Sequence, residues 1–254
     1  MKVLVIGGGV GGLAAARALH ADGHAVSVFE RAGGLRTTGA ALTLWSNGTG
    51  ILADLGVSLD GAGAPVDVLR QCTWDGRHLV DIDVGRAAAV QWWFDVRWSP
   101  AGPVPDSPLE ALRRRFGHWA SPARDVLALA REDDLEFFPH FKHRVPRTWG
   151  TGPITLVGDA AHSMPPTRAQ GANQALEDAW LLAHELRRGT GALPDVLRGY
   201  ERTRSRKAGI VARHAGTEDI NKYRPWLSRL IPEAFLARYY TYWIKQISDY
   251  LPRR

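Results

Sequence analysis

The stretch KVLVIGGGVGGLAAARALHADGHAVSVFER, residues 2–31, decides the fold. It starts with an apolar run, Lys2–Ile6, as in a strand covered on both faces. The next residues, Gly7 to Gly12, have the spacing G-x-G-x-x-G. In this motif the first glycine makes a tight turn, the second lets the backbone approach a pyrophosphate, and the third lets a helix pack on the strand. We therefore expect a helix from Val10 to about Ala21, with its first amides aimed at phosphate groups.

An acidic residue follows the second expected strand at the place where such a unit binds a ribose. The strand is Ala25–Phe29 and the acid is Glu30. A carboxylate there indicates the unphosphorylated ribose of FAD or NAD, although the neighbouring Arg31 leaves a phosphorylated ribose open. Strand, glycines, helix, strand and acid in this order are far more specific than the glycines alone. The cofactor-binding residues expected here are Gly7, Gly9, Val10, Gly11, Gly12, Glu30 and Arg31.

A second motif lies in TLVGDAAHSMPPTRAQGANQALEDAW, residues 155–180. A strand, Ile154–Val157, is expected to end in Gly-Asp, which places a carboxylate at the edge where α/β folds bind ligands. Two prolines fix an extended turn. A helix then begins near Gln170, where small residues let a flat ligand approach and free amides favour negative charge. The residues expected to contact the ligand are Asp159, Gly171, Ala172 and Asn173.

Polar residues in this segment also have simpler explanations. His162 is expected to be a packed or solvent-facing histidine, and Asp159 can serve as a cap after the strand. Glu177 and Asp178 are expected to serve helix electrostatics and salt bridges rather than proton transfer. The catalytic residues stay unassigned, and the candidates for proton transfer or anion stabilisation are Asp159, His162 and Arg168.

The second motif resembles the flavin-contacting segment of the FAD-dependent aromatic hydroxylases, the single-component monooxygenases that include p-hydroxybenzoate hydroxylase and urate hydroxylase. Their pattern is close to G-D-A-A-H-x-x-x-P-x-x-G-Q-G-x-N, and residues 158–173 depart from it at Ala169, where the family usually has glycine. The segments TTGAALTLWSNGTGILADLGV, WFDVRW, LEALRRRFGHW and RTWGTGPITLVGDA also match. The resemblance implies FAD as cofactor and NADH or NADPH as reductant. It implies that Asp159 contacts the ribityl chain, that amides near Gly171, Ala172 and Asn173 face the flavin, and that Arg36 lies near it.

The resemblance covers residues 1 to about 85 and about 89 to 220, and the long family insert between these blocks is nearly missing. The missing part would hold an arginine-containing helix that grips FAD, a second Asp-Gly motif and most of the substrate-covering sheet. The fold implied is an α/β, Rossmann-like FAD-binding fold of the p-hydroxybenzoate hydroxylase type, truncated, with a helical C-terminal region. We expect one domain over residues 1–254, made of a nucleotide-binding half (1–86), a remnant of the substrate-covering region (87–150) and a part with the second motif and C-terminal helices (151–254).

The missing insert has a consequence for the sheet. In the family, the strand that ends in the lost Asp-Gly lies between the first strand and the Ile154–Val157 strand. Its loss leaves two apolar edges, and open edges are prone to aggregation. The two strands can close up, a hairpin expected over Leu69–Val84 around Asp75-Gly76 can join the sheet, or a second protomer can donate a strand. We favour a rearranged sheet, with a homodimer as the alternative.

Charge and composition exclude several classes of protein. The net charge is +6, but the basic residues are scattered without a nucleic-acid-binding motif, so no nucleic-acid partner is expected. A single cysteine, Cys72, excludes a disulfide scaffold and a cysteine-rich metal site, and fits a reducing, cytoplasmic setting. We expect no metal. No apolar run approaches the roughly 18 residues of a transmembrane segment.

Two aromatic segments remain for a substrate cover. In VQWWFDVRW, the side chains of Trp92, Trp93 and Trp98 either wall a pocket or pack in the core, and we favour the core. The C-terminal run RPWLSRLIPEAFLARYYTYWIKQISDYL reads as one or two helices that cover the active site, form a dimer face or lie on a membrane. A plain amphipathic cover over the core is favoured.

These patterns predict an FAD-dependent, monooxygenase-like oxidoreductase that acts on a flat, apolar or aromatic small molecule in secondary metabolism, in which the cofactor carries the hard chemistry. One alternative is a flavin-free cyclase, isomerase or dehydratase whose substrate occupies the vacated cofactor cleft. The other is a non-catalytic partner of a full-length relative.

Overall fold

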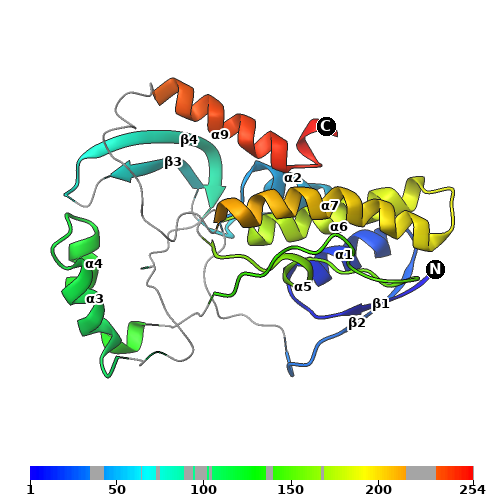
Figure 1. Cartoon of the computed structure of the whole chain (residues 1–254), viewed down its shortest axis with the longest axis horizontal. Helices are drawn as coiled ribbons and strands as arrows, with labels where there is room; N and C mark the ends of the chain where they lie inside the picture. The colour runs from blue at the N-terminus through cyan, green and yellow to red at the C-terminus, as the bar shows by residue number, and fades with distance from the viewer. Residues whose placement is uncertain are drawn as a thin grey trace.

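A computed structural model describes residues 1–34, 43–63, 65–72, 75–88, 94, 102, 105–135, 140–166, 169–215 and 233–253. Its strands are β1 (Lys2–Ile6), β2 (Ala25–Phe29), β3 (Pro65–Cys72) and β4 (His78–Ala88). Its longer helices are α1 (Val10–Ala21), α2 (Ser46–Asp54), α3 (Pro108–Phe116), α4 (Ala123–Leu129), α6 (Gly171–Arg188), α7 (Leu193–Ala215) and α9 (Glu233–Ile247). Short helices are α5 (Asp159–His162) and the 3-10 turns Glu132–Asp134 and Leu251–Arg253. In Figure 1, α1, α6 and α7 are stacked at the centre and α9 lies above them.

The nucleotide-binding unit at the N-terminus is confirmed. β1 pairs in parallel with β2 from Lys2 opposite Ala25 to Ile6 opposite Phe29. The intervening helix α1 runs from Val10 to Ala21, as the glycine spacing predicts. On one face of the strand pair, Val3 and Val26 pack against buried residues of α1 and α6. This packing fixes the glycine turn between β1 and the start of α1.

The other face of this strand pair is bare. Leu4 and Ile6 of β1 are 69% and 89% exposed, and Phe29 of β2 is 56% exposed. The prediction that Lys2–Ile6 is covered on both faces is therefore wrong. The reason is visible in Figure 1, where the described helices next to β1 and β2 lie on one side of the pair.

The prediction of a strand at Ile154–Val157 is also wrong, because these residues lie in no sheet. Within the described residues, β1 pairs only with β2, so no neighbouring strand takes up the backbone groups of this segment. Side chains of α7 bond two of its carbonyls instead. Arg198 Nη2 donates to the Ile154 carbonyl at 2.7 Å, and the Tyr200 hydroxyl donates to the Leu156 carbonyl at 3.1 Å. Within the part of the chain that the structure describes, the two expected strands have not closed up, and the rearranged sheet that we favoured is not seen.

The predicted hairpin is confirmed, but it forms a separate sheet. β3 and β4 are antiparallel, with Leu69 opposite Ile82, and Asp75 and Gly76 lie in the connection. Gly76 has φ +84°, a conformation that glycine adopts without strain. The hairpin does not extend the pair β1–β2, so it covers neither edge of that pair. It contacts α9 instead.

The central helix α6 joins two hydrophobic clusters. Towards α1 and α2, Leu176 and Ala179 pack with the buried Ile51. Towards α7, Leu181 packs with Tyr200. Because α6 begins at the second motif, this double packing holds the motif against the glycine turn.

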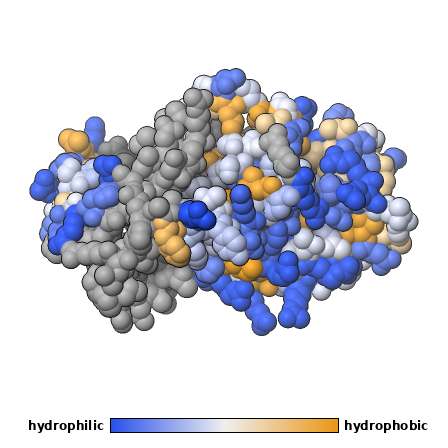
Figure 2. Space-filling model, turned by 90° about the horizontal axis from the view of Figure 1, so that it is seen from above, coloured by the Kyte–Doolittle hydropathy of each residue, from blue (hydrophilic) through white to orange (hydrophobic). Residues whose placement is uncertain are grey.

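The C-terminal helix α9 is an amphipathic cover, as favoured from the sequence. Trp243, Ile244 and Ile247 pack against the buried Trp45 and Val211. Its outer face carries exposed aromatic residues, namely Phe235, Tyr239 and Tyr242. Seen from above, hydrophobic residues are dispersed among hydrophilic ones wherever the surface in Figure 2 is not grey. The tryptophans Trp92, Trp93 and Trp98 lie outside the described residues.

Candidate cofactor site

The two motifs meet at the N-terminal ends of α1 and α6. A Cβ built on Gly11 would lie 3.3 Å from the Cβ of Ala175 and 3.6 Å from the nitrogen of Gly158. A methyl group at Gly11 would therefore be tight against Ala175, so the two turns are in close contact. The glycine turn and the Gly-Asp turn therefore lie in contact, although no strand lies between them in the described structure.

The glycines of the first turn have the separate roles that their spacing predicts. Gly7 has φ +103°, and its amide donates to the Phe29 carbonyl at 2.7 Å. A Cβ on Gly12 would lie only 2.1 Å from the Gly7 carbonyl oxygen, so this position requires glycine. A Cβ on Gly9 would meet nothing within 4 Å. The second glycine of the motif therefore faces open space, which fits a backbone that a phosphate approaches.

Glu30 fixes the glycine turn from the end of β2. Its Oε2 accepts the Gly8 amide at 2.7 Å and its Oε1 accepts the Ala32 amide at 2.9 Å. The bonds from Ala32 and Gly8 hold the pKa of this exposed carboxyl below its ordinary value, so the group is ionised at neutral pH. It retains lone pairs that face solvent and suit a ribose hydroxyl. Arg31 beside it is exposed, and Arg36 lies outside the described residues.

The second turn places Asp159 at the start of the short helix α5 rather than at the end of a strand. Gly158 has φ +61° and is buried, whereas Asp159 is exposed. The Gly158 amide donates to Asp178 Oδ2 at 2.7 Å, which anchors the turn on α6. The Asp159 carboxylate therefore faces solvent from an anchored turn, as a ligand-binding group would. Arg168 lies outside the described residues.

The start of α6 combines an open backbone with a fixed side chain. A Cβ on Gly171 would meet nothing within 4 Å. Asn173, in contrast, is fully buried, and its Oδ1 accepts the Trp45 amide at 2.9 Å while its Nδ2 donates to the carbonyls of Thr43 and Ala169. The Asn173 side chain therefore positions the preceding turn, so only its backbone can serve a ligand.

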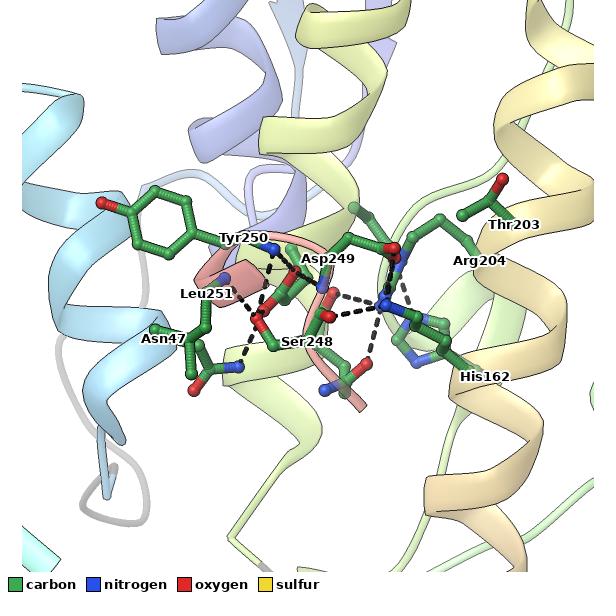
Figure 3. A network of polar contacts seen from close by, with 12 residues as sticks. Asn47, His162, Thr203, Arg204, Ser248, Asp249, Tyr250 and Leu251 are labelled. Atoms are coloured by element: carbon green, nitrogen blue, oxygen red, sulfur yellow. Dashed lines mark hydrogen bonds and ion pairs between the residues drawn. The ribbon is translucent and has the colours of Figure 1, made fainter. Parts of the chain in front are cut away.

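Beneath the second turn lies a buried polar network that sequence patterns did not reveal (Figure 3). His162 is fully buried, which confirms a packed histidine, and its Nε2 donates to Asp178 Oδ2 at 2.6 Å. Arg204 Nε donates to Asp178 Oδ1 at 2.6 Å. Burial disfavours the charged form of Asp178, but attraction to His162 and Arg204 outweighs it and lowers the pKa of Asp178. The expected salt-bridge role of Asp178 is thus confirmed.

The network escaped prediction because its members come from separate elements. His162 belongs to α5, Asp178 to α6 and Arg204 to α7. The one available signal was a pair of adjacent acids, Glu177 and Asp178, within an otherwise apolar and small-residue stretch of helix. Such a pair indicates buried partners but does not identify them.

Ala169 carries backbone strain at the entrance to α6. Its φ of 49° is positive, and it is the one described non-glycine residue with this conformation. A left-handed residue with a Cβ costs about 1–2 kcal/mol. We therefore expect Ala169→Gly to raise the free energy of unfolding by about 0.5–1 kcal/mol, measured by urea denaturation. The control is Ala172→Gly inside the first turn of α6, which should lower it by about as much; a loss of stability in both variants would contradict the strain.

Two protein families match separate parts of the chain. Residues 5–59 match the NAD(P)-binding Rossmann-like domain, and residues 118–215 match the FAD binding domain. The first match contains the glycine turn and Glu30, and the second contains the Gly-Asp turn and α6. The two halves of the candidate site thus fall in two nucleotide-binding family matches.

Sequence relatives are oxygenases, matched over part of their length. The chain is 32% identical over 177 residues to a zeaxanthin epoxidase of Oncidium hybrid cultivar, which covers 64% of this chain and 26% of that protein. It is 36% identical over 158 residues to the 3-amino-4-hydroxybenzoate 2-monooxygenase PtnB3 of Streptomyces platensis, which covers 58% of this chain and 38% of that protein. The match thus spans less than two fifths of the length of either relative.

Solved structures show the same fold. Klebsiella pneumoniae HpxO complexed with FAD and uric acid superposes with a TM-score of 0.73 at 19% identity, over 86% of this chain and 88% of that chain. Pseudomonas aeruginosa PqsL in complex with 2-aminobenzoylacetate gives a TM-score of 0.69 at 18% identity, over 89% and 97%. These structures confirm the Rossmann-like FAD-binding fold. The resemblance to the FAD-dependent aromatic hydroxylases is borne out by the FAD binding domain match and the monooxygenase relatives.

Proposed function

We propose that this chain, which shares its two cofactor motifs and its fold with the FAD-dependent aromatic hydroxylases, binds FAD and acts as a monooxygenase on a flat, apolar or aromatic small molecule. The observation that carries the proposal is the contact between the glycine turn and the Gly-Asp turn at Gly11 and Gly158. A dinucleotide that spans both turns needs them side by side, and unrelated turns have no reason to meet there.

The residues at the site fit the two ends of FAD. The open backbone at Gly9 and the ionised Glu30 suit the pyrophosphate and ribose of the ADP half. The exposed Asp159 suits the hydroxyls of the ribityl chain, and the open backbone at Gly171 lets a flat ring approach the positive end of α6. FAD, when bound, supplies the redox chemistry, with NADH or NADPH as the source of electrons. The protein's own residues at the two turns bind and orient the cofactor.

The reaction class rests on the relatives. The 3-amino-4-hydroxybenzoate 2-monooxygenases of Streptomyces, to which this chain is similar, act on an aromatic acid. An aromatic or flat apolar substrate of secondary metabolism is therefore the first class to test here. A cytoplasmic setting is part of this proposal, since the reductants are cytoplasmic and Cys72 is an unpaired thiol. Among the described helices, none has the length and apolar character needed to cross a bilayer.

A homodimer is also part of the proposal, since the bare face of β1 and β2 exposes Leu4, Ile6 and Phe29. Apolar side chains grouped on a sheet face favour burial against another protein surface. A second copy of the chain would supply that surface. A solution mass of twice the 27.9 kDa of one chain would support this assembly, and a stable monomer would exclude it.

The experiment that tests the function is the absorbance spectrum of the purified protein, followed by reconstitution with FAD. We expect a flavin spectrum, and oxidation of NADH or NADPH by the reconstituted protein that increases when aromatic acids are added. A protein that stays colourless after incubation with FAD would reject the proposal. It would then favour a flavin-free reaction in the same site, for which the incomplete match to full-length relatives is the motivating observation.

A further inference from the structure

A continuous hydrogen-bonded path connects the cofactor turn with the end of the chain. It begins at the Gly158 amide, which donates to Asp178 Oδ2, and it passes from Asp178 Oδ1 to Arg204 Nε at 2.6 Å. Arg204 Nη1 then donates to Asp249 Oδ2 at 3.2 Å. The partner of the other Asp249 oxygen is Lys207, whose Nζ lies 2.7 Å from Oδ1. Each side chain in the middle of this path is thus held from both ends.

The path is buried except at Lys207, whose side chain is 14% exposed. Asp178 and Arg204 are fully buried, and Asp249 is 4% exposed. Charge interactions between buried groups are strong because water does not screen them. A displaced Asp249 would leave the buried Nη1 of Arg204 without its acceptor, while Nη2 stays bonded to Gln174. An unsatisfied buried donor is costly, so the guanidinium would shift towards another acceptor, and the Asp178 carboxylate that it binds would shift with it. Since Asp178 anchors Gly158, the loss would reach the turn that carries Asp159.

The far end of the path is the C-terminal turn Ser248–Leu251, which follows α9 (Figure 3). The amides of Asp249 and Tyr250 donate to Glu177 Oε2 at 2.8 and 3.1 Å. Glu177 is the neighbour of Asp178 on α6, so the turn is bonded to the same helix segment that anchors the cofactor turn. The turn is therefore placed to act on that anchor rather than only to end the chain.

We infer that the C-terminal turn Ser248–Leu251 is a positioning element of the FAD site, which sets the Gly158–Asp159 turn through Asp249, Arg204 and Asp178. The inference deepens the proposed function and rests on it where FAD is concerned. The two sites are then coupled, and coupling is reciprocal. Docking of the C-terminal turn raises the affinity for FAD, and bound FAD protects the C-terminal turn from opening.

The test is Asp249→Asn, which keeps the shape of the side chain and removes the charge that Arg204 and Lys207 share. Hydrogen exchange of the Gly158 amide, measured on the protein without FAD, should accelerate about threefold or more. The Kd for FAD, measured by flavin fluorescence, should rise about fivefold or more. Lys207→Met is the second variant, in case Asp249→Asn does not fold, and it should shift both quantities in the same direction.

The matched control is Arg253→Ala, which removes a contact of the same C-terminal segment with Glu185 at 3.6 Å but lies outside the path. It should leave the exchange of Gly158 and the Kd for FAD unchanged. The inference is overturned if Asp249→Asn loosens residues 248–251 without an effect at Gly158, or if the control has the same effect at Gly158. If wild-type protein binds no FAD, the proposed function fails, while the exchange of Gly158 still decides whether the turn is positioned from the C-terminus.

Discussion

Gly12→Ala should disrupt the glycine turn and abolish FAD binding. The added Cβ would lie 2.1 Å from the Gly7 carbonyl oxygen, which is backbone and cannot rotate away. Either β1 and α1 separate or the turn changes conformation, and both cost packing between α1 and α6. We expect the free energy of unfolding to fall by about 3 kcal/mol, the upper end of the usual range for overpacking. Stability is measured by urea denaturation of the protein without FAD. FAD is then titrated in the absence of urea, at a temperature at which the variant is folded.

Gly9→Ala, at the second glycine of the same motif, is the matched control. A Cβ there meets nothing within 4 Å, and the residue has φ −75°, which alanine adopts readily. Stability without FAD should therefore stay within about 0.5 kcal/mol of wild type. The Kd for FAD should rise about tenfold or more, because the methyl group occupies space that a pyrophosphate needs. If Gly9→Ala leaves the affinity unchanged, the open space at Gly9 does not face the cofactor.

The N-terminal unit was predictable because its determinants are local. Glycine spacing fixed the turn between Gly7 and Gly12, and the helix from Val10 to Ala21 followed with its observed bounds. The Asp75-Gly76 hairpin was predictable for the same reason, since a turn signal lies between two alternating segments. Both the glycine turn with its helix and the hairpin are determined by interactions between residues close in sequence.

The predictions that were wrong depend on contacts between residues far apart in the sequence. Residues 154–157 have the composition of a strand, but a strand also needs a neighbour, and α7 side chains satisfy the carbonyls of Ile154 and Leu156 instead. The exposure of Leu4 and Ile6 has the same origin, since an apolar run indicates a preference for burial without showing what covers it. The network around Asp178 joins α5, α6 and α7 with the C-terminal turn, and no local pattern marks such a group.

Glu177→Met should strongly lower the stability of the protein. The carboxylate is fully buried and accepts from the Ser248 hydroxyl, from the Asp249 and Tyr250 amides, and from Asn47 Nδ2. Methionine fills a similar volume but accepts none of these bonds. Donors left buried without acceptors carry their full desolvation cost. We expect the free energy of unfolding to fall by about 3–5 kcal/mol, because each buried donor left without an acceptor costs about 1–3 kcal/mol.

Two comparisons separate this effect from a general response of the helix. Glu185→Met, two turns further along α6, removes a side chain that is 35% exposed and lies 3.6 Å from Arg253, so it should change stability by less than about 1 kcal/mol. Glu177→Gln keeps one acceptor oxygen but turns an amide group towards donors. Its fall in the free energy of unfolding should therefore lie between those of Glu177→Met and Glu185→Met. Urea denaturation measures all three variants, and hydrogen exchange at residues 248–251 shows whether the C-terminal turn detaches first. Equal losses for Glu177→Met and Glu185→Met would mean that the buried acceptor does not hold the turn.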